Sequence, residues 1–492
     1  MADNSLKPVL GIDLGTTFSC AARWADTHPE VYKLKSGREE IPSIVYMQDS
    51  GTPLVGTYAR QRLVIDPDNG VANIKRFMGD DSKTVVLRGK SYTPVDISAL
   101  ILERIKADIE SMFPSNAGFE IAGVVVTHPQ YFKYPQIART QQAAEQAGLP
   151  VIRLLSEPVA AALDYGLKEY QGLERECREK ILVFDLGGGT FDVTVLEVIN
   201  TINNLTFKVL GVGGDDMLGG TNFDDALQQW CLKQQGIDFS AVDPASRDKA
   251  IMKLNEQCIT AKEELSAMEE TFIAVPNILD GQHIDAAITR KTFEEEVIGR
   301  YCDRIRAIVA DTIARANLRS GELNRTILIG GSSRIPIMRR IVHDETGLEP
   351  WANADPSLAV CRGAAFLAAM EDGRVDFKKE LSIEEVTSHA LGVRAADDKF
   401  AILIPANRPA PVEATKIFTV NSTEFTVTPY QGSGKKVTEE SVIALKPIQI
   451  SGVQLDANGR ADVKITFKVN EHQLLFVKVD APGVSEQRQM EF

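Results

Sequence analysis

Two near-copies of one glycine-rich phrase lie far apart in this chain. The phrase reads Ile-Asp-Leu-Gly-Thr-Thr at residues 12–17 and Phe-Asp-Leu-Gly-Gly-Gly-Thr at residues 184–190. We interpret each as a β-hairpin with a polar tip, because an apolar run enters each phrase and apolar residues resume after it. Glycine has no Cβ, so backbone N–H groups at such a tip can approach phosphate oxygens closely. Two matching tips therefore indicate two related half-domains facing each other across a phosphate chain.

The aspartate of each phrase has a different role. Phosphate repels a carboxylate, so we expect Asp13 and Asp185 to hold Mg²⁺ through water from opposite sides. A single phrase of this kind is more often an ordinary turn, whereas two in matching contexts favour a nucleotide site. A third element, a buried strand that ends in Gly330 and Gly331 before a helix, could lie against a base and ribose. Taken alone, this third element is typical of a plain strand-to-helix turn.

Length and composition bound the class of protein. The chain has 492 residues, 44% hydrophobic and 25% charged, which is typical of a soluble globular protein of about two to four domains. The net charge of −14 argues against a general nucleic-acid binder. No basic-then-apolar signal pattern or bilayer-spanning run is present in the sequence, and the six scattered cysteines indicate reduced, mostly buried thiols. We therefore expect a cytoplasmic protein.

The pattern of expected secondary structure divides the chain into two regions. Through about residue 375 strands and helices alternate, which predicts an α/β architecture. The expected strands are 8–13, 123–127, 181–185, 193–198 and 326–329, and the expected helices are 97–112, 135–147, 158–165, 223–235, 247–266 and 291–316. From about residue 390 short alternating runs predict a small antiparallel β-sandwich, with strands at 400–404, 416–420, 425–429, 446–450, 462–467 and 474–479. The charged segment between these two regions is expected to be an exposed linker.

These motifs resemble those of the DnaK-type heat-shock chaperone family. The two hairpins, the phrase Ser-Glu-Pro-Val-Ala-Ala-Ala-Leu-Asp-Tyr-Gly at 156–166 and the turn Ile-Gly-Gly-Ser-Ser-Arg at 329–334 occur in the family's order and approximate spacing. Actins and sugar kinases share the two-lobed fold, but the Glu-Pro-x-Ala-Ala-Ala phrase and the β-rich tail fit the chaperone branch better. The resemblance implies an actin-like (ribonuclease H-like) α/β ATPase domain at 1–377, with lobe I at about 1–176 and lobe II at about 177–377. It further implies a linker at 378–386 and a peptide-binding β-sandwich at 387–492.

The resemblance also implies a phosphate site and a catalytic set. The residues that match the phosphate and metal positions are Asp13, Thr16, Thr17, Asp185, Gly187, Gly188, Gly189 and Thr190. Lys75 matches the lysine that reaches the γ-phosphate, although alone it would be a surface lysine. Glu157 resembles the glutamate that orients the metal's waters or the attacking water, and Asp192 the carboxylate that helps to order water and monovalent ions such as K⁺. Phosphoryl transfer to water mainly needs alignment and charge neutralisation, so slow hydrolysis of ATP to ADP and phosphate needs no histidine or cysteine.

Further residues resemble the family's base-binding and signalling positions. Lys262 and Ser266, at i and i+4 on one helix face, resemble ribose and adenine contacts, and Arg334 resembles the arginine that stacks near adenine. By analogy the same pocket is lined by Gly214, Gly330, Gly331 and Ser332. Interdomain coupling is assigned to Pro129, to Arg153, which matches the arginine that meets the linker and J-domain partners, and to the linker residues Leu381, Ile383 and Glu385.

The chain departs from the family pattern at three places. Ile259 replaces a glutamate that contacts the ribose, and Ile137 replaces an arginine linked to interdomain signalling. The linker carries a serine and a glutamate where the family has successive apolar residues, which weakens its burial by about 1–3 kcal/mol. Because of these departures, the resemblance supports ATP binding more strongly than it supports allosteric coupling.

In the tail, Val393, Phe418, Phe425 and Val427 fall where the family places its apolar peptide pocket. The alternative is that these four residues are plain sandwich core. The chain reaches Phe492 about where the family's last β-strand ends, so we expect a lidless or truncated member, whose bound peptide exchanges faster because nothing closes over it.

The sequence thus predicts an ATP-dependent chaperone, with ATP or ADP and Mg²⁺ as cofactors. Its expected partners are extended apolar polypeptides, a J-domain co-chaperone and a nucleotide-exchange factor, with no nucleic acid and no membrane. It is expected to be a monomer or a weak dimer. Two rivals remain: an ATP-binding scaffold or co-chaperone that does not hydrolyse, and a sugar-kinase-like enzyme. The latter leaves the β-rich tail unexplained.

Overall fold

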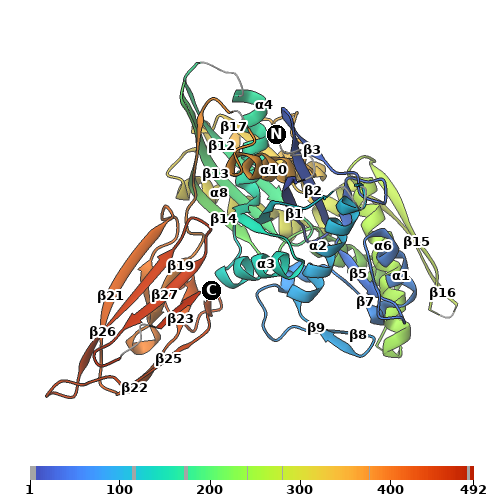
Figure 1. Cartoon of the computed structure of the whole chain (residues 1–492). Helices are drawn as coiled ribbons and strands as arrows, with labels where there is room; N and C mark the ends of the chain where they lie inside the picture. Colours follow the sequence, from blue (N-terminus) through green and yellow to red (C-terminus); the bar gives the residue numbers. More distant parts are fainter. Residues whose placement is uncertain are drawn as a thin grey trace.

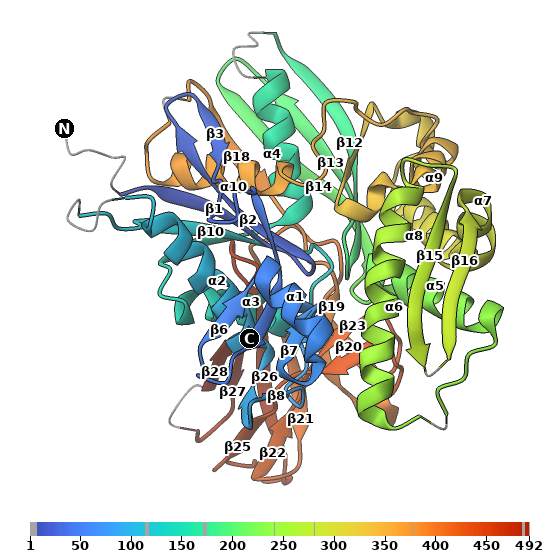
Figure 2. The same cartoon turned by 90° about the vertical axis from the view of Figure 1, so that its right-hand side faces the viewer.

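The computed structural model describes residues 7–113, 118–170, 175–240, 242–279, 281–375, 377–484 and 488–491. Residues before about 375 form two lobes, each built on its own mixed β-sheet (Figure 2). The sheet of lobe I has the order β11-β10-β1-β2-β3, with β4 paired to β2. Its strands are β1 (Val9–Leu14), β2 (Phe18–Ala25), β3 (His28–Val31), β4 (Glu40–Pro42), β10 (Gly123–His128) and β11 (Val151–Ser156).

The sheet of lobe II repeats this pattern. Its order is β17-β12-β13-β14-β18, built from β12 (Cys177–Leu186), β13 (Phe191–Asn200), β14 (Asn204–Asp215), β17 (Arg325–Ile329) and β18 (Glu380–Glu384). In each lobe an antiparallel hairpin, β1–β2 or β12–β13, has its first strand paired in parallel with a later strand, β10 or β17. The two hairpins are therefore equivalent elements of two related halves, as the repeated phrase predicts.

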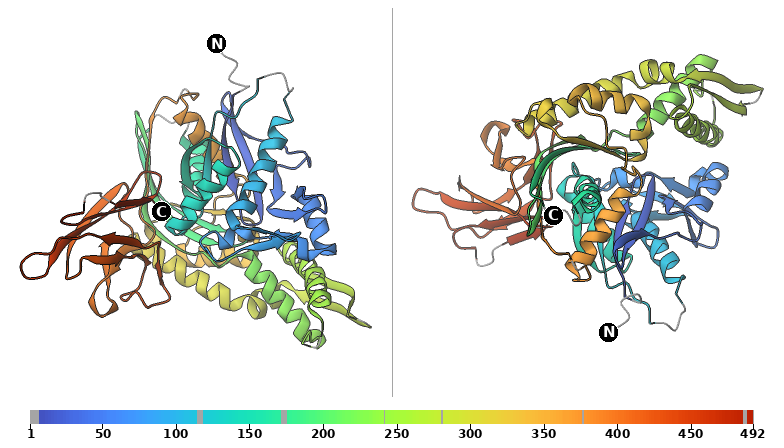
Figure 3. Two further views of the ribbon diagram at one scale, coloured as in Figure 1. Left: turned by 60° about the horizontal axis from the view of Figure 1, so that its bottom comes forward. Right: turned by 90° about the horizontal axis from the view of Figure 1, so that it is seen from above.

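Two helices fill the space between the sheets (Figure 3). Helices α4 (Glu157–Tyr170) and α10 (Ala359–Glu371) share one apolar cluster with strands of both sheets. They approach closely because Gly363 of α10 faces the carbonyl of Ala160, where any side chain would overlap the α4 backbone. Gly11 of β1 meets α10 in the same way, so small residues set the thickness of this central layer.

The outer face of lobe I carries α2 (Pro94–Glu110) and α3 (Tyr134–Gln146), whose cores are continuous with the sheet. α2 starts at a capping box in which Thr93 and Asp96 satisfy each other's backbone N–H groups. Lobe I also contains α1 (Thr57–Ile65), β5 (Ile44–Met47), β6 (Pro53–Val55), β7 (Gly70–Ala72), β8 (Val85–Leu87) and β9 (Lys90–Tyr92).

Lobe II continues through helices and a two-stranded sheet on its far side. These elements are α5 (Gly220–Gln235), α6 (Pro244–Leu265), β15 (Glu270–Leu279), β16 (Gln282–Thr289), α7 (Arg290–Thr292), α8 (Gly299–Arg315) and α9 (Pro336–Thr346). One long helix was predicted at 291–316, and this is wrong in its first part. A π-helical turn, η4 (Phe293–Val297), interrupts it, and the N–H of Ile298 donates to the carbonyl of Phe293. Phe293 and Ile298 are both fully buried there, so tertiary packing overrides the regular helical period.

The tail forms the predicted β-sandwich, coloured orange to red in Figure 1. Two four-stranded sheets, β20-β19-β23-β24 and β21-β26-β27-β28, and a two-stranded sheet, β22-β25, make it up. Along β26 buried and exposed residues alternate, which is the period of a half-buried strand. The strands are β19 (Ala390–Arg394), β20 (Phe400–Ile404), β21 (Val412–Val420), β22 (Glu424–Val427), β23 (Pro429–Gly432), β24 (Val442–Ala444), β25 (Ile448–Ser451), β26, β27 (Leu475–Asp480) and β28 (Arg488–Glu491), with β26 at Ala461–Val469.

The sandwich is docked on lobe I beside α3 (Figure 1). Tyr134, at the start of α3, belongs to the apolar core of the sandwich, and Leu474 of the sandwich belongs to the core of lobe I. The Tyr134 N–H also donates to Gln431 Oε1 at 3.1 Å. The two bodies therefore share both apolar and hydrogen-bonded contacts.

The segment 378–386 corrects the expectation of an exposed linker. Its residues form β18, which pairs in parallel with β14, from Asn204 opposite Glu380 to Lys208 opposite Glu384. Leu381 and Ile383 pack partly buried against the layer that contains α4 and α10. The polar residues do not prevent docking, because strand pairing satisfies the backbone and the two apolar side chains point inward.

Candidate functional site

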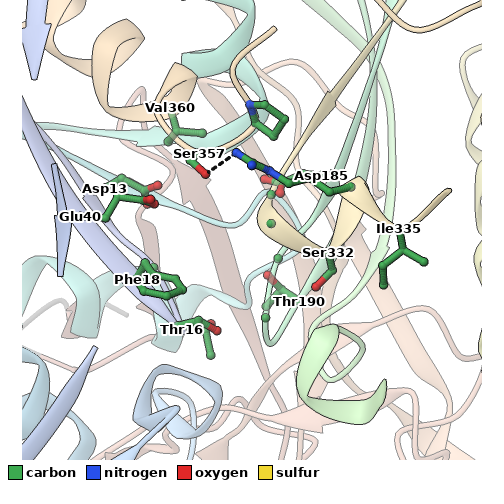
Figure 4. A pocket seen from close by; sticks show the side chains of 18 of the residues that line it. Asp13, Thr16, Phe18, Glu40, Asp185, Thr190, Ser332, Ile335, Ser357 and Val360 are labelled. Carbon is green, nitrogen blue, oxygen red and sulfur yellow. Dashed lines mark hydrogen bonds between the residues drawn. The ribbon is translucent and has the colours of Figure 1, made fainter. Parts of the chain in front are cut away.

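A cavity of about 630 Å³ lies between the two hairpin tips (Figure 4). The first hairpin contributes Asp13, Thr16 and Thr17, and the second contributes Asp185 and Thr190. In Figure 4 side chains of both lobes converge on the same space. The other predicted residues on the cavity wall are Lys75, Glu157, Gly187, Gly188, Lys262, Ser266, Gly330, Gly331, Ser332 and Arg334.

The two tips touch each other through their glycines. A Cβ on Gly188 would overlap the Thr17 hydroxyl, and one on Gly189 would come within 2.6 Å of the Thr16 methyl. Gly189 faces Thr16 and Arg76 in this way and does not line the cavity. The glycines thus let the lobes close on each other while backbone N–H groups remain near the cavity.

Lys75 and Glu157 form a buried ion pair at the cavity wall. Lys75 Nζ donates to Glu157 Oε1 at 2.8 Å, and the lysine side chain is 3% exposed. Lys75 lies in the short helix η3 (Ile74–Phe77), which follows the left-handed residue Asn73, and Glu157 is the first residue of α4. Lys75 is therefore not an ordinary surface lysine. Its ammonium is buried, and a buried ammonium needs a compensating charge, which Glu157 provides.

The carboxylates of the cavity outnumber the cations that neutralise them. Burial and the nearby Glu157 raise the pKa of Asp13 to about 7, against the lowering effects of Lys75 and of the Thr127 hydroxyl. Burial and the charge of Glu157 also raise the pKa of Asp185 well above its usual value. Two carboxylates that resist ionisation at one place fit a divalent cation, which would favour their charged forms. Among the described residues no group of three or more His, Cys, Asp or Glu could hold a metal directly, so the fit is to a cation held largely through water.

Asp192 lies behind the second hairpin and not in the cavity. It pairs across the hairpin with Asp185, and its Oδ1 accepts the Tyr131 N–H at 2.7 Å. Its Oδ2 is buried without a hydrogen-bond partner in the described part of the chain. Burial and the charge of Glu157 raise the pKa of Asp192 well above its ordinary value. Gly214, opposite Asp192 on β14, packs against Tyr131 and is not among the residues that line the cavity.

The far end of the cavity combines a helix and a turn. Lys262 Nζ lies 2.7 Å from Asp224 Oδ1, an ion pair that the sequence did not reveal. Arg334 donates to Ser357 Oγ at 3.1 Å, and Gly330 adopts a φ of 80° that favours glycine. This end of the cavity is therefore formed by backbone atoms of the Gly330 turn and by side chains from α6 that present both apolar and polar atoms. The further lining residues that sequence reasoning missed are Gly15, Phe18, Glu40, Glu263, Ala267, Ile335, Pro356, Ser357 and Val360.

The comparisons with known proteins agree with this geometry. The family model described as Hsp70 protein matches residues 9–491. The chain is 34% identical to proteins named Chaperone protein DnaK from Thermotoga petrophila, Thermotoga maritima and Thermotoga neapolitana. Each alignment covers 98% of this chain and 80% of the relative.

The chain belongs to the Hsp70 family. Its fold is that of the family: actin-like α/β lobes followed by a β-sandwich. As a member of this family the chain uses ATP or ADP with Mg²⁺. No helix among the described residues is both long and apolar enough to cross a membrane. The six cysteines are free, and five of them are buried, as expected from their scattered positions.

The predicted coupling residues make contacts within the lobes and between lobe I and the linker. Ser156, directly before Glu157, donates its hydroxyl to the buried carboxylate of Glu385. Arg153 lies near enough to lower the pKa of Glu385, which burial raises, but its ion pair at 2.8 Å is with Glu371. Pro129 accepts the Phe132 N–H in the turn that leads into α3. Ile137, where the family carries arginine, is buried in the core of lobe I.

The residues that hold the sandwich against the turn after Pro129 were not predicted from the sequence. Ser388 donates its hydroxyl to the carbonyl of Gln130, and His389 Nε2 lies 3.0 Å from the carbonyl oxygen of Tyr131. The rings of Tyr131 and His389 are 4.3 Å apart between centroids. The Tyr131 backbone therefore contacts the sandwich on one side and Asp192 on the other.

The four residues assigned to a peptide pocket all face the core of the sandwich. Val393 and Val427 are buried, and Phe418 and Phe425 are partly buried against the same apolar cluster. Phe418 pairs with Val463 across β21 and β26. This placement is compatible with both interpretations given above, a pocket and a plain core.

Proposed function

We propose that the cleft hydrolyses ATP and that the chain uses nucleotide state to control its grip on extended polypeptides. The chain is an ATP-dependent molecular chaperone of the Hsp70 family, and it uses ATP or ADP with Mg²⁺. The observation that supports our residue assignment is the buried Lys75–Glu157 pair, placed on the wall of a cavity between two opposed aspartates. A non-hydrolysing scaffold is not favoured, because this pair and both aspartates are retained.

The chain's own residues would lower the barrier by neutralising and aligning. Lys75 is held inside the cavity, where its ammonium can stabilise negative charge on the terminal phosphate. Glu157 holds Lys75 and has a second carboxylate oxygen with which to orient water. The hydroxyl of Thr190 and the backbone N–H groups of the two tips would contact phosphate oxygens. Asp13 and Asp185 would hold Mg²⁺ through water, and the ion would supply charge neutralisation for the phosphate chain.

We assign the far end of the cavity to adenosine. Ser266 lies one helical turn from Lys262, so both reach the same side of α6. Arg334 projects from the Gly330–Gly331 turn and could stack on the base. Lys262 would contact the ribose from its ion pair with Asp224. We further assign Asp192, with its unpartnered buried oxygen, to an ordered water or K⁺ behind the phosphates.

Coupling between cleft and sandwich would run through contacts on both edges of the cleft. One route is the linker strand β18, whose Leu381 and Ile383 extend the sheet that carries the second hairpin. The other is the Tyr131 backbone, which joins Asp192 to His389. We propose domain boundaries of 1–377 for the ATPase domain, 378–386 for the linker and 387–492 for the peptide-binding sandwich.

We assign peptide binding to the surface around Val393, Phe418, Phe425 and Val427. Family membership supports unfolded polypeptides and co-chaperones as partners in general. We propose that the co-chaperones are a J-domain protein and a nucleotide-exchange factor, that the protein acts in the cytoplasm, and that it is a monomer or weak dimer.

Single-turnover hydrolysis tests the assignment of the catalytic pair. Preformed ATP complexes of the wild type and Glu157→Gln are chased with unlabelled ATP, and phosphate release is followed. Glu157→Gln should keep ATP affinity within a few-fold and lose hydrolysis by about 100-fold, as expected for a group that acts on the transition state. Equal rates in the two proteins would refute the role of Glu157, and no ATP binding by the wild type would refute the site.

A further inference from the structure

The cavity wall carries a carboxylate, Glu40, that none of the roles above uses. Glu40 is half-buried and lines the nucleotide cavity. Among the described residues it has no hydrogen-bond or ion-pair partner within reach. Figure 4 shows its carboxylate directed into the same space as that of Asp13.

Strand register explains this position. Asp13 on β1 is opposite Cys20 on β2, and Cys20 is opposite Glu40 on β4. Residues directly opposite in antiparallel strands place their side chains on the same face. Asp13, Cys20 and Glu40 therefore form a row on one face of the sheet. Cys20 is buried against α10, whereas Asp13 and Glu40 line the cavity, about 10 Å apart at two strand spacings.

The cations near the cavity do not balance Glu40. Lys75 is paired with Glu157, and Lys262 with Asp224. Burial raises the pKa of Glu40, the charge of Arg334 lowers it and that of Asp355 raises it, and the net shift is upward. Of the acidic side chains on the wall, Glu263 is exposed, which leaves Glu40, Asp13 and Asp185 directed inward without a cation of their own.

We propose that Glu40 makes this cleft selective for metal-complexed nucleotide over free nucleotide. This inference rests on the proposed ATP site. A free triphosphate brings several negative charges beside an unpaired carboxylate, whereas its metal complex brings fewer. For a phosphate charge on the order of 10 Å from the Glu40 carboxylate and an effective dielectric constant of about 20, the repulsion of one unit charge weakens binding roughly tenfold. Glu40 is thus a specificity residue that acts through charge and takes no part in the chemical step.

The neighbouring residue offers a matched control. Glu39 carries the same charge, directly precedes β4 and is not among the residues that line the cavity; it lines separate hollows beside Tyr32 and Arg38. Glu40→Gln removes the charge with little change in shape, and Glu40→Asp retains it. Glu39→Gln changes the net charge of the protein by the same amount as Glu40→Gln.

The experiment measures the dissociation constants of ATP and ADP by calorimetry for the wild type, Glu40→Gln, Glu40→Asp and Glu39→Gln. Each constant is measured once with excess Mg²⁺ and once with EDTA. Glu40→Gln should lower the ratio of the EDTA constant to the Mg²⁺ constant about tenfold for ATP and less for ADP. Glu40→Asp and Glu39→Gln should keep the wild-type ratio. An unchanged ratio in Glu40→Gln, or an equal fall in Glu39→Gln, would overturn the inference. Failure of every protein to bind nucleotide with Mg²⁺ would instead overturn the proposed ATP site.

Discussion

His389 should make docking of the sandwich sensitive to pH. The imidazole is buried between the two bodies, and burial lowers its pKa from 6.5 to about 4. This value includes the raising effect of the hydrogen bond to the Tyr131 carbonyl, the lowering effects of Lys133 and Arg315, and the raising effect of Asp216. The docked state therefore holds His389 neutral, and protonation favours release of the sandwich into water.

The magnitude follows from the two pKa values. Because the docked value is depressed, the contribution of His389 to docking is complete above pH 6.5 and is lost as the pH falls towards 4. Between pH 7.5 and 5.0 the docking equilibrium should weaken by about 2 kcal/mol, or about 30-fold. Glu385, whose pKa burial raises, acts in the opposite direction because its protonation favours the docked state.

One variant distinguishes the effect of His389 from that of Glu385. His389→Asn keeps a hydrogen-bond donor but does not titrate, whereas Glu385 is present in both proteins. The radius of gyration, measured by small-angle X-ray scattering from pH 7.5 to 5.0, should rise in the wild type as the sandwich undocks. It should rise much less in His389→Asn. Identical pH responses in the two proteins would refute the role given to His389.

Three further variants test the cleft and the linker. Lys75→Ala should lower single-turnover hydrolysis about 100-fold while ADP binding persists, since one charge donor to the transition state is lost; Lys90→Ala, an exposed lysine, is the control, and unchanged hydrolysis in Lys75→Ala would contradict the assignment. Gly188→Val should abolish ATP binding in a calorimetric titration because its side chain would overlap the first hairpin, whereas Gly321→Ala meets no neighbour within 4 Å; binding retained by Gly188→Val would show that the tips need not touch. Ile383→Asp should expose β18 to amide hydrogen exchange at neutral pH by burying a charge in its place; wild-type protection would argue against a buried Ile383.

Much of the architecture was predictable because local patterns are enough to specify it. The repeated phrase places both hairpins, and the register of β1–β2 and β12–β13 brings Asp13 and Asp185 to opposite walls of one cavity. Lys75 could be found only through its resemblance to a family phrase. A buried lysine has the same sequence signature as a surface lysine until its partner is placed.

The remaining features depend on contacts between distant segments. The charged composition of 378–386 indicated exposure, but strand pairing with β14 outweighs two polar residues. The position of Glu40 follows from a three-residue strand paired to β2, a register that no local motif indicates. A glycine-rich joint predicts a close approach but does not identify the neighbour, which for Gly214 is Tyr131.

The central claim is that one cleft hydrolyses ATP and reports its state to the sandwich. Single-turnover hydrolysis, measured with and without a saturating extended apolar peptide, tests it most directly. The wild type should hydrolyse ATP and do so several-fold faster with peptide, while Ile383→Asp should keep the basal rate and lose the stimulation. Hydrolysis that peptide leaves unchanged in the wild type would contradict coupling, and tight ATP binding without hydrolysis would contradict the catalytic assignment.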